Sequence, residues 1–302
     1  SGVSAKGIKG LVRVVIDGGS YNIDAADDAI HTSGDVVLSG GVGTVTTGDD
    51  AVHAETSLTI EAGDLTVAKA YEGLESASIA IRGGSTYLVT SDDGVNGSTG
   101  SDGTEGMFGP QQATASASGA TATVVISGGR LVVDAAGDGL DSNGSMTISG
   151  GTIIVNGPTG SANAAIDGGN FSITGGFLVS VHTEQMADEI SGTSAQNVLK
   201  ASLGTVQPAG TLIHLQSSAG AGLLTFAPAK SFRALVFSAP DFVAGSYALY
   251  IGGTATGSEQ DGLYEAAQYT PGTLFGDLTV SSALTTLGTS AAGMMGGSRN
   301  AF

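Results

Sequence analysis

The stretch from Asp24 to Asn96 reads DAADDAIHTSGDVVLSGGVGTVTTGDDAVHAETSLTIEAGDLTVAKAYEGLESASIAIRGGSTYLVTSDDGVN, and it repeats one short phrase four times. Each copy consists of an acidic residue, a small residue, an aliphatic residue and a second polar residue. The copies are spaced 22, 22 and 21 residues apart, and a constant period in this range indicates a stack of structural repeats. They begin at Asp28, Asp50, Glu72 and Asp93.

Weaker copies of the phrase extend the repeat on both sides of this stretch. The first has lysines in both polar places, the second restores the acidic form, and the third is degenerate. They are Lys6-Gly7-Ile8-Lys9, Asp138-Gly139-Leu140-Asp141 and Ala164-Ala165-Ile166-Asp167.

Between the phrases lies a second repeated unit, in which two glycines follow a short run that alternates apolar and polar residues. Val36-Val37-Leu38-Ser39-Gly40-Gly41 is an example. Alternation is typical of strands, and glycine supplies the positive φ that sharp corners need. No segment keeps helical periodicity. The pattern therefore predicts an all-β protein, a parallel β-helix with coils of about 22 residues stacked about 4.8 Å apart.

The composition excludes several classes of protein. Hydrophobic residues make up 41%, so the 50 glycines indicate corners and not disorder. The absence of cysteine excludes disulfides and thiolate metal sites. No apolar run is long enough to span a membrane. The formal charge of −18 argues against nucleic acid and anionic membranes as partners. Residues 1–190 carry 23 of the 28 acidic residues, so the acidity belongs to the repeats.

Three parts of the chain are expected. Residues 1–181 form the β-helix repeats, with an irregular loop at 97–119 that we interpret as shaping a ligand cleft. Residues 182–288 form a smaller β-rich subdomain that closes the end of the solenoid, because a bare terminal coil exposes an edge prone to aggregation. Residues 289–302 are interpreted as a tail.

The repeated acids should form a column, with Asp28, Asp50 and Glu72 on adjacent rungs and Asp93 after them. Unpaired like charges at this spacing repel by about 1 kcal/mol or more. Calcium ligands on opposite sides of the ion lie about 4.6–5.2 Å apart, which matches one rung, whereas magnesium needs a tighter shell. We therefore expect Ca²⁺ as the cofactor, against the alternative of a solvated column that holds no ion.

His31 and His53 occupy the second polar column. Stacked imidazoles near carboxylates can bind zinc, but the surroundings are otherwise rich in oxygen. We expect these two histidines to be surface imidazoles that pair with acids or contact ligand, and we expect Asp138 and Asp141 to contact ligand.

Several phrases resemble a known family. DDAIHTSGDVVLSGG, DDAVHAETSLTIEAGDLTV, YEGLESASIAIRGG and SDDGVNG are similar to secreted bacterial β-helical carbohydrate-binding domains related to polysaccharide lyases. The C-terminal SAPDFVAGSYALYIGG and GLYEAAQYTPGT resemble the closing segment of that family. The resemblance covers roughly residues 6–288. It departs at the start, where the family has more chain upstream of the Lys6 coil.

The resemblance implies a right-handed, pectate-lyase-like solenoid that binds calcium and attaches to cellulose or to acidic polymers such as polygalacturonate. It also implies a secreted protein, located outside the cell or at its surface. Carried over by position, the residues that it assigns to calcium are Asp27, Asp28, Asp49, Asp50, Glu72, Glu75, Asp92, Asp93 and Asn96.

Three functions remain open at this point. The first is a non-catalytic, calcium-dependent polysaccharide-binding protein. The second is a polysaccharide lyase, in which calcium neutralises a uronate and a lysine abstracts a proton. Lys69 is the first candidate base and the Lys6/Lys9 pair the second, although we expect all three to form ion pairs with the acids. The third is a structural subunit of an extracellular filament or adhesin.

The ends of the chain raise the question of self-association. The phrase at Lys6 is in register with the coils that follow, so only residues 1–5 precede a rung. Either a natural cap has been removed, which is the interpretation we favour, or another chain covers the edge. In the second case, end-to-end polymers would depend on residues 289–302.

Overall fold

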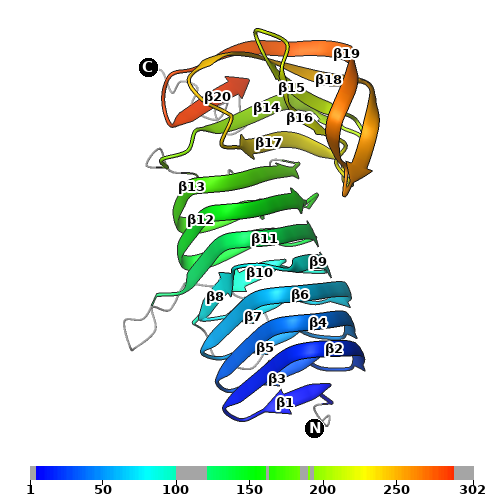
Figure 1. Cartoon of the computed structure of the whole chain (residues 1–302), viewed down its shortest axis with the longest axis vertical. Helices are drawn as coiled ribbons and strands as arrows, with labels where there is room; N and C mark the ends of the chain where they lie inside the picture. Colours follow the sequence, from blue (N-terminus) through cyan, green and yellow to red (C-terminus); the bar gives the residue numbers. More distant parts are fainter. Residues whose placement is uncertain (1–4, 100–120, 161–162, 184–189, 191–193, 289–302) are drawn as a thin grey trace, which may run out of the picture.

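The computed structural model describes residues 5–99, 121–160, 163–183, 190 and 194–288, and these contain strands but no helix (Figure 1). The described residues between 6 and 182 wind into a parallel solenoid of about seven turns, which confirms the predicted β-helix. Each turn has three faces. The described part of the chain has no helix that is long and apolar enough to cross a membrane.

The first face is built from short parallel strands. The register pairs equivalent residues of successive phrases, so that Ile30 lies beside Val52 and Val52 beside Leu74. All three are fully buried, because the aliphatic residue of each phrase points into the solenoid. The strands are β1 (Ile8–Gly10), β3 (Ile30–Thr32), β5 (Val52–Ala54), β7 (Leu74–Ser76) and β10 (Val95–Gly97).

Long strands that bend at the glycine pair form the other two faces. In the fourth turn the long strand is divided in two, and in the last two turns it is continuous with the short strand. The long strands are β2 (Arg13–Ala25), β4 (Asp35–Thr47), β6 (Ser57–Ala70), β8 (Ser78–Ile81) with β9 (Ser85–Thr90), β11 (Thr123–Ala135), β12 (Leu140–Asn156) and β13 (Ile166–His182). Their alternate aliphatic residues stack into one continuous core.

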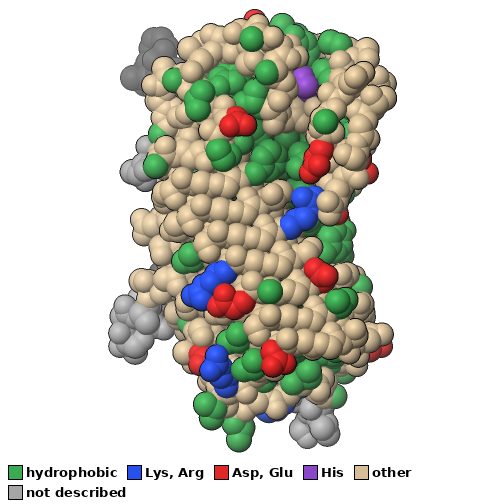
Figure 2. All heavy atoms as spheres, in the orientation of Figure 1, with side chains coloured by type: hydrophobic (Ala, Val, Ile, Leu, Met, Phe, Trp, Pro, Cys, Tyr) green, Lys and Arg blue, Asp and Glu red, His purple; other side chains and the backbone are tan. Residues whose placement is uncertain are grey.

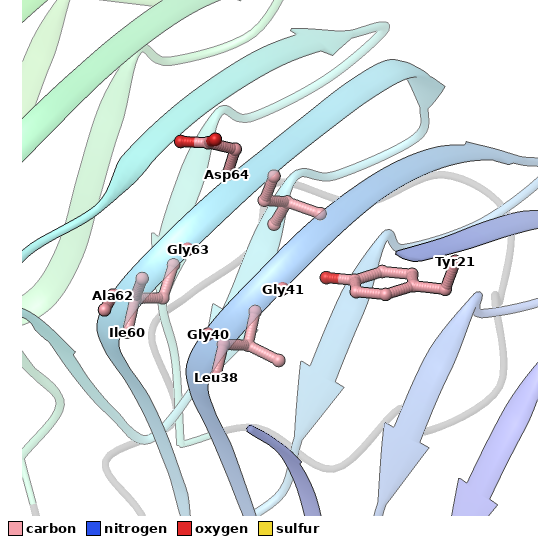
Figure 3. Close-up of a pocket in the computed structure, with 9 residues that line it drawn as sticks. Tyr21, Leu38, Gly40, Gly41, Ile60, Ala62, Gly63 and Asp64 are labelled. Carbon is pink, nitrogen blue, oxygen red and sulfur yellow. The ribbon is translucent and has the colours of Figure 1, made fainter. Parts of the chain in front are cut away.

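The glycine pair makes the bend between these two faces, as Figure 3 shows for Gly40-Gly41 and Ala62-Gly63 on adjacent turns. The second glycine has a positive φ at every turn, for example +90° at Gly41. A Cβ on Gly41 would also lie 2.9 Å from the carbonyl oxygens of Gly18 and Gly19 on the preceding turn. Conformation and close stacking therefore both require glycine at this position.

This corner allows the two requirements to be measured separately. Gly19 has a φ of +80° but nothing within 4 Å of its ideal Cβ. Gly19→Ala should therefore lower the free energy of unfolding by about 1–2 kcal/mol through backbone strain alone. Gly41→Ala adds the clash with the preceding turn and should cost more. Urea denaturation of both variants checks this, and equal losses would contradict it.

The solenoid is continuous across the expected irregular loop. Val95 of β10 pairs directly with Leu140 of β12, and Val124 of β11 pairs with Ile79 of β8. Gly97 ends β10, and residues 100–120 lie outside the described residues, as do residues 289–302 of the expected tail. The predictions of a cleft-shaping loop and of a tail therefore stay predictions.

Beyond β13 the parallel order ends. The next strands are β14 (Val198–Gln207), β15 (Ile213–Ser217), β16 (Gly222–Phe226), β17 (Phe232–Ser238), β18 (Gly245–Gln260), β19 (Leu263–Val280) and β20 (Leu284–Gly288). Strand β17 pairs antiparallel with β13 and with β14, so it covers the edge of the last turn. Strands β15, β16, β19 and β18 close into a small barrel, and its buried apolar residues belong to one cluster with Val132, Ile154 and Val179 of the solenoid.

At the opposite end, the first turn is formed by β1 and β2, which pair with β3 and β4. Leu11 and Val12 are 79% and 77% exposed there. On the face drawn in Figure 2, charged side chains are few, and some of them lie next to a side chain of opposite charge. End-to-end self-association stays a prediction, to be checked by light scattering.

Candidate functional site at the acidic corner

In each turn, a corner precedes the short strand. The repeated acids stack at this corner. The backbone N–H of Ala29 donates to the carbonyl oxygen of Asp50 at 2.9 Å, that of Ala51 to Glu72 at 3.0 Å, and that of Gly73 to Asp93 at 3.0 Å. Successive acids therefore occupy equivalent positions, as predicted. We call the stacked residues of this corner and of the adjoining short strands the acidic corner.

Three columns make up the acidic corner, and equivalent residues are joined by backbone pairing from turn to turn. The first column is Asp27, Asp49, Tyr71 and Asp92; the second is Lys6, Asp28, Asp50, Glu72, Asp93 and Asp138; the third is Lys9, His31, His53, Glu75, Asn96, Asp141 and Asp167. Every residue that the sequence analysis assigned to calcium or ligand therefore lies in this one region. Lys69 lies outside it.

At the N-terminal part of the corner, Lys6 neutralises two acids. Its Nζ lies 3.2 Å from Oδ1 of Asp27 and also contacts Oδ2 of Asp28, which is only 2% exposed. Burial lowers the pKa of Lys6, but the hydrogen bonds and charges of Asp28 and Asp27 outweigh it and raise that pKa overall. Lys6 is therefore a built-in cation of the first turn.

In the middle of the corner, His53 lies between carboxylates. Its Nδ1 is 3.3 Å from Oδ2 of Asp50, 3.3 Å from Oε2 of Glu75 and 3.9 Å from Oδ2 of Asp28. His31 Nδ1 lies 2.6 Å from the same Asp28 oxygen, and the two imidazole rings meet edge to face at 5.0 Å. Both histidines are buried. The expected pairing with acids is therefore observed, but the expectation that the two imidazoles lie on the surface is wrong.

The neighbouring acids form no ion pair with a lysine or arginine among the described residues. Burial, then the charge of Asp50, raises the pKa of Glu72 to about 8, although Asn96 Nδ2 donates to Glu72 Oε2 at 2.9 Å. Burial, then the charge of Asp92, raises the pKa of Asp93 to about 8. Burial, then the charge of Glu72, also raises the pKa of Glu75. These side chains favour a bound proton or cation at neutral pH.

The C-terminal part of the corner gathers three carboxylates. Oxygens of Asp138, Asp141 and Asp167 lie within 4.8 Å of one another, and all three side chains are partly exposed. Asp167 was not among the predicted site residues, because the leading acid of its phrase is replaced by Ala164. Its register with Asp141 was the signal that could have identified it.

Tyr71 is a second residue that the sequence analysis missed. It occupies the first column between Asp49 and Asp92, and its side chain is 43% exposed. The signal was present in the phrase YEGLE, where tyrosine stands in the place of the first aspartate of DDAIH and DDAVH. An exposed aromatic ring among acids offers an apolar surface beside polar ones.

The ion pairs expected for the lysines form only in part. Lys6 forms them, but among the described residues neither Lys9 nor Lys69 does, and both are exposed. For Lys69 the expectation was wrong because β6 contains a bulge: Val45 pairs with Val67, but the next residue, Thr46, pairs with Lys69. This extra residue places Lys69 on the outer surface of β6.

The donor groups of the corner differ in their fit to calcium. Asp138, Asp141 and Asp167 offer only oxygen, which calcium prefers. Asp27, Asp28 and Asp49 also offer only oxygen, but Lys6 already neutralises the first two. The two remaining groups include imidazole nitrogen from His31 or His53 and fit calcium less well. Among the described residues, the last group of the corner therefore fits calcium best.

Comparison with known proteins gives one match. Residues 1–51 match the model of a family described as "Carbohydrate-binding domain-containing protein", which supports the resemblance of the chain to a carbohydrate-binding family. The matched segment ends at Ala51, so it includes the whole phrase that begins at Asp28 and the first two residues of the phrase that begins at Asp50. Neither the curated proteins nor the solved structures searched gave a match.

Proposed function

We propose that this protein binds polysaccharides at the acidic corner, outside the cell or at its surface, with calcium and without catalysis. The observation that carries the proposal is the continuous acidic corner itself, in which carboxylates recur on successive rungs around the exposed ring of Tyr71. The match of residues 1–51 to a carbohydrate-binding family supports it. A linear array of equivalent groups suits a linear polymer with repeating units.

The ligand class follows from the chemistry of the corner. Sugar rings present C–H faces that pack on aromatic side chains, and Tyr71 offers such a surface. The carboxylates that surround it repel a uronate unless a cation lies between the two. Asp138, Asp141 and Asp167 would hold the calcium ion, which would link protein carboxylates to uronate carboxylates or sugar hydroxyls. Cellulose or polygalacturonate is the proposed ligand.

The lysines support binding without catalysis. A lysine acts as a base when burial or a neighbouring cation favours its neutral form. Lys6 has a raised pKa next to Asp28 and Asp27, so it stays protonated. Lys69 is exposed on β6, so burial does not favour its neutral form. Neither side chain meets the requirement for the lyase alternative.

Binding to insoluble cellulose and to polygalacturonate tests the function. Tyr71→Ala should weaken binding roughly fivefold to tenfold, the effect of about 1 kcal/mol of aromatic contact. Tyr264→Ala, which alters a tyrosine of the C-terminal barrel, is the matched control and should bind normally. Equal binding by the wild type and Tyr71→Ala would exclude the corner around Tyr71 as the binding surface. Release of unsaturated, ultraviolet-absorbing uronate product would contradict the absence of catalysis.

Calcium dependence is tested separately. If calcium binds only the folded state, a hundredfold excess over its dissociation constant raises the free energy of unfolding by about 2.7 kcal/mol. The double variant Asp138→Asn with Asp141→Asn should lose most of this gain, whereas Asp241→Asn, outside the solenoid, should keep it. Differential scanning calorimetry with and without chelator measures the effect. A melting temperature that calcium does not change would contradict this part of the proposal.

A further inference from the structure

The group around His53 differs from the rest of the acidic corner because it combines imidazole nitrogen with carboxylate oxygen in a buried position. His53 is 3% exposed and Asp50 is 6% exposed. Glu75 comes from the next rung, where it is the register partner of His53. Two columns of the corner, on adjacent rungs, therefore bring three donor atoms within 4.8 Å of one another.

The distances in this group match the edges of a metal coordination shell. Zinc binds nitrogen and carboxylate oxygen at about 2.0–2.2 Å, so two of its tetrahedral ligands lie about 3.3–3.5 Å apart. His53 Nδ1 is 3.3 Å from Oδ2 of Asp50 and 3.3 Å from Oε2 of Glu75. A direct charge-assisted hydrogen bond is shorter, about 2.7–2.9 Å. Both gaps also fit two ligands around a shared ion, and the donor atoms of Asp50, His53 and Glu75 all lie within 4.8 Å of one another.

The surroundings add what such a site requires. The Asp28 carboxylate, whose Oδ2 is 3.9 Å from His53 Nδ1, is a nearby further donor and is held by His31 at 2.6 Å. Burying several carboxylates together is costly unless a cation compensates them. Lys6 compensates Asp27 and Asp28, but no ion pair of Lys6 with Asp50 or Glu75 is present.

We propose that Asp50, His53 and Glu75 form a binding site for a divalent metal ion of the zinc class, distinct from the oxygen-only group that suits calcium. Imidazole favours zinc, cobalt and nickel over calcium, because calcium takes oxygen ligands almost exclusively. The ion stabilises two turns of the solenoid by joining β5 to β7 and to the preceding corner. This inference does not depend on polysaccharide binding.

Metal content and cobalt spectroscopy of the whole chain test the site. After incubation with Zn²⁺ and dialysis, elemental analysis should find one tightly held zinc per chain, even with a hundredfold excess of Ca²⁺. Co²⁺ in place of zinc should give the intense visible absorption of a four-coordinate site. Displacement of zinc by calcium, or a weak six-coordinate cobalt spectrum, would overturn the proposal.

Variants locate the ion. His53→Asn should reduce zinc affinity at least a hundredfold and abolish the cobalt spectrum, whereas Asp138→Asn should leave both unchanged. Full zinc retention in His53→Asn would overturn the assignment. Because His53 is buried, Glu75→Gln serves as a second variant that keeps the size of the side chain, and it should weaken zinc binding at least tenfold. If neither variant folds, the cobalt spectrum and calcium competition of the unaltered chain decide the question.

Discussion

In the presence of chelator, the protein should lose several kcal/mol of its free energy of unfolding as the pH rises from about 4.5 to about 8. The groups responsible are Glu72 and Asp93, whose pKa values are each raised to about 8 in the folded protein, first by burial and then by neighbouring carboxylates. In the unfolded chain they titrate near 4.5 and 3.8. The folded state therefore binds protons more tightly than the unfolded state.

The direction of the effect follows from this difference. Below the unfolded pKa both states are protonated and the stabilisation is complete, and it is lost as the pH rises through the folded pKa. Each tenfold change in proton affinity corresponds to about 1.4 kcal/mol, so Glu72 alone contributes up to about 5 kcal/mol. This trend is opposite to that of a protein whose carboxylates form strong ion pairs.

Two substitutions check the assignment. Glu72→Gln should reduce the dependence of stability on pH, because glutamine stays neutral and keeps the size of the side chain. Glu55→Gln removes an acid that is exposed on the neighbouring turn and should leave the dependence unchanged. Unfolding temperatures at pH 5.5 and 8.5 in chelator provide the comparison. A wild type that is as stable at pH 8.5 as at pH 5.5 would contradict the prediction.

The fold was predictable from the sequence because each coil repeats the same physical constraints. The aliphatic residue of each phrase must be buried, as Ile30, Val52 and Leu74 are, and the corner must accept a positive φ, as Gly41 does. One period of about 22 residues therefore specifies the strands, the corners and their register together. The four-stranded closure of the C-terminal barrel follows no such period, and only its short strands were predicted.

The candidate site was predictable in position but not in chemistry. Register placed the acids in columns, whereas the contacts of each side chain depend on local departures from the repeat. Lys69 illustrates this, since a single bulge in β6 places it on the outer surface. Asp167 and Tyr71 illustrate the converse, because both occupy columns of the corner although their phrases are degenerate or altered. The period of the repeat specifies which residues stack in one column. The contacts of each side chain depend on local bulges and on substitutions within the phrases.

The acidic corner therefore compensates its charge differently along its length. In the first turn, Lys6 pairs with the acids. In the middle turns, His53 lies beside carboxylates, and the pKa values of Glu72 and Asp93 are raised. The last described group, at Asp138, is partly open to solvent. Repulsion between carboxylates at rung spacing sets the same requirement everywhere. Which cation or proton meets the requirement depends on the residue at each column position.

Replacing Lys6 should show whether a divalent cation can take the place of a built-in one. Lys6→Met keeps the length and apolar contacts of the side chain but leaves Asp28, which is 2% exposed, without its closest positive charge. Removing one partner of a buried pair is strongly destabilising, so we expect a loss of about 3 kcal/mol in chelator. Calcium should restore much of this loss in Lys6→Met, because Asp27, Asp28 and Asp49 then form an open group of oxygen donors.

Lys9→Met is the matched control for this experiment. Lys9 occupies the other polar place of the same phrase and is exposed, so its loss should change the free energy of unfolding by less than about 0.5 kcal/mol, with or without calcium. Urea denaturation of both variants at pH 7, in chelator and in calcium, separates the outcomes. Stability lost in Lys6→Met but not regained with calcium would mean that the first turn needs the geometry of the ammonium group. No loss at all would contradict the assignment of Lys6 as the charge that compensates Asp28.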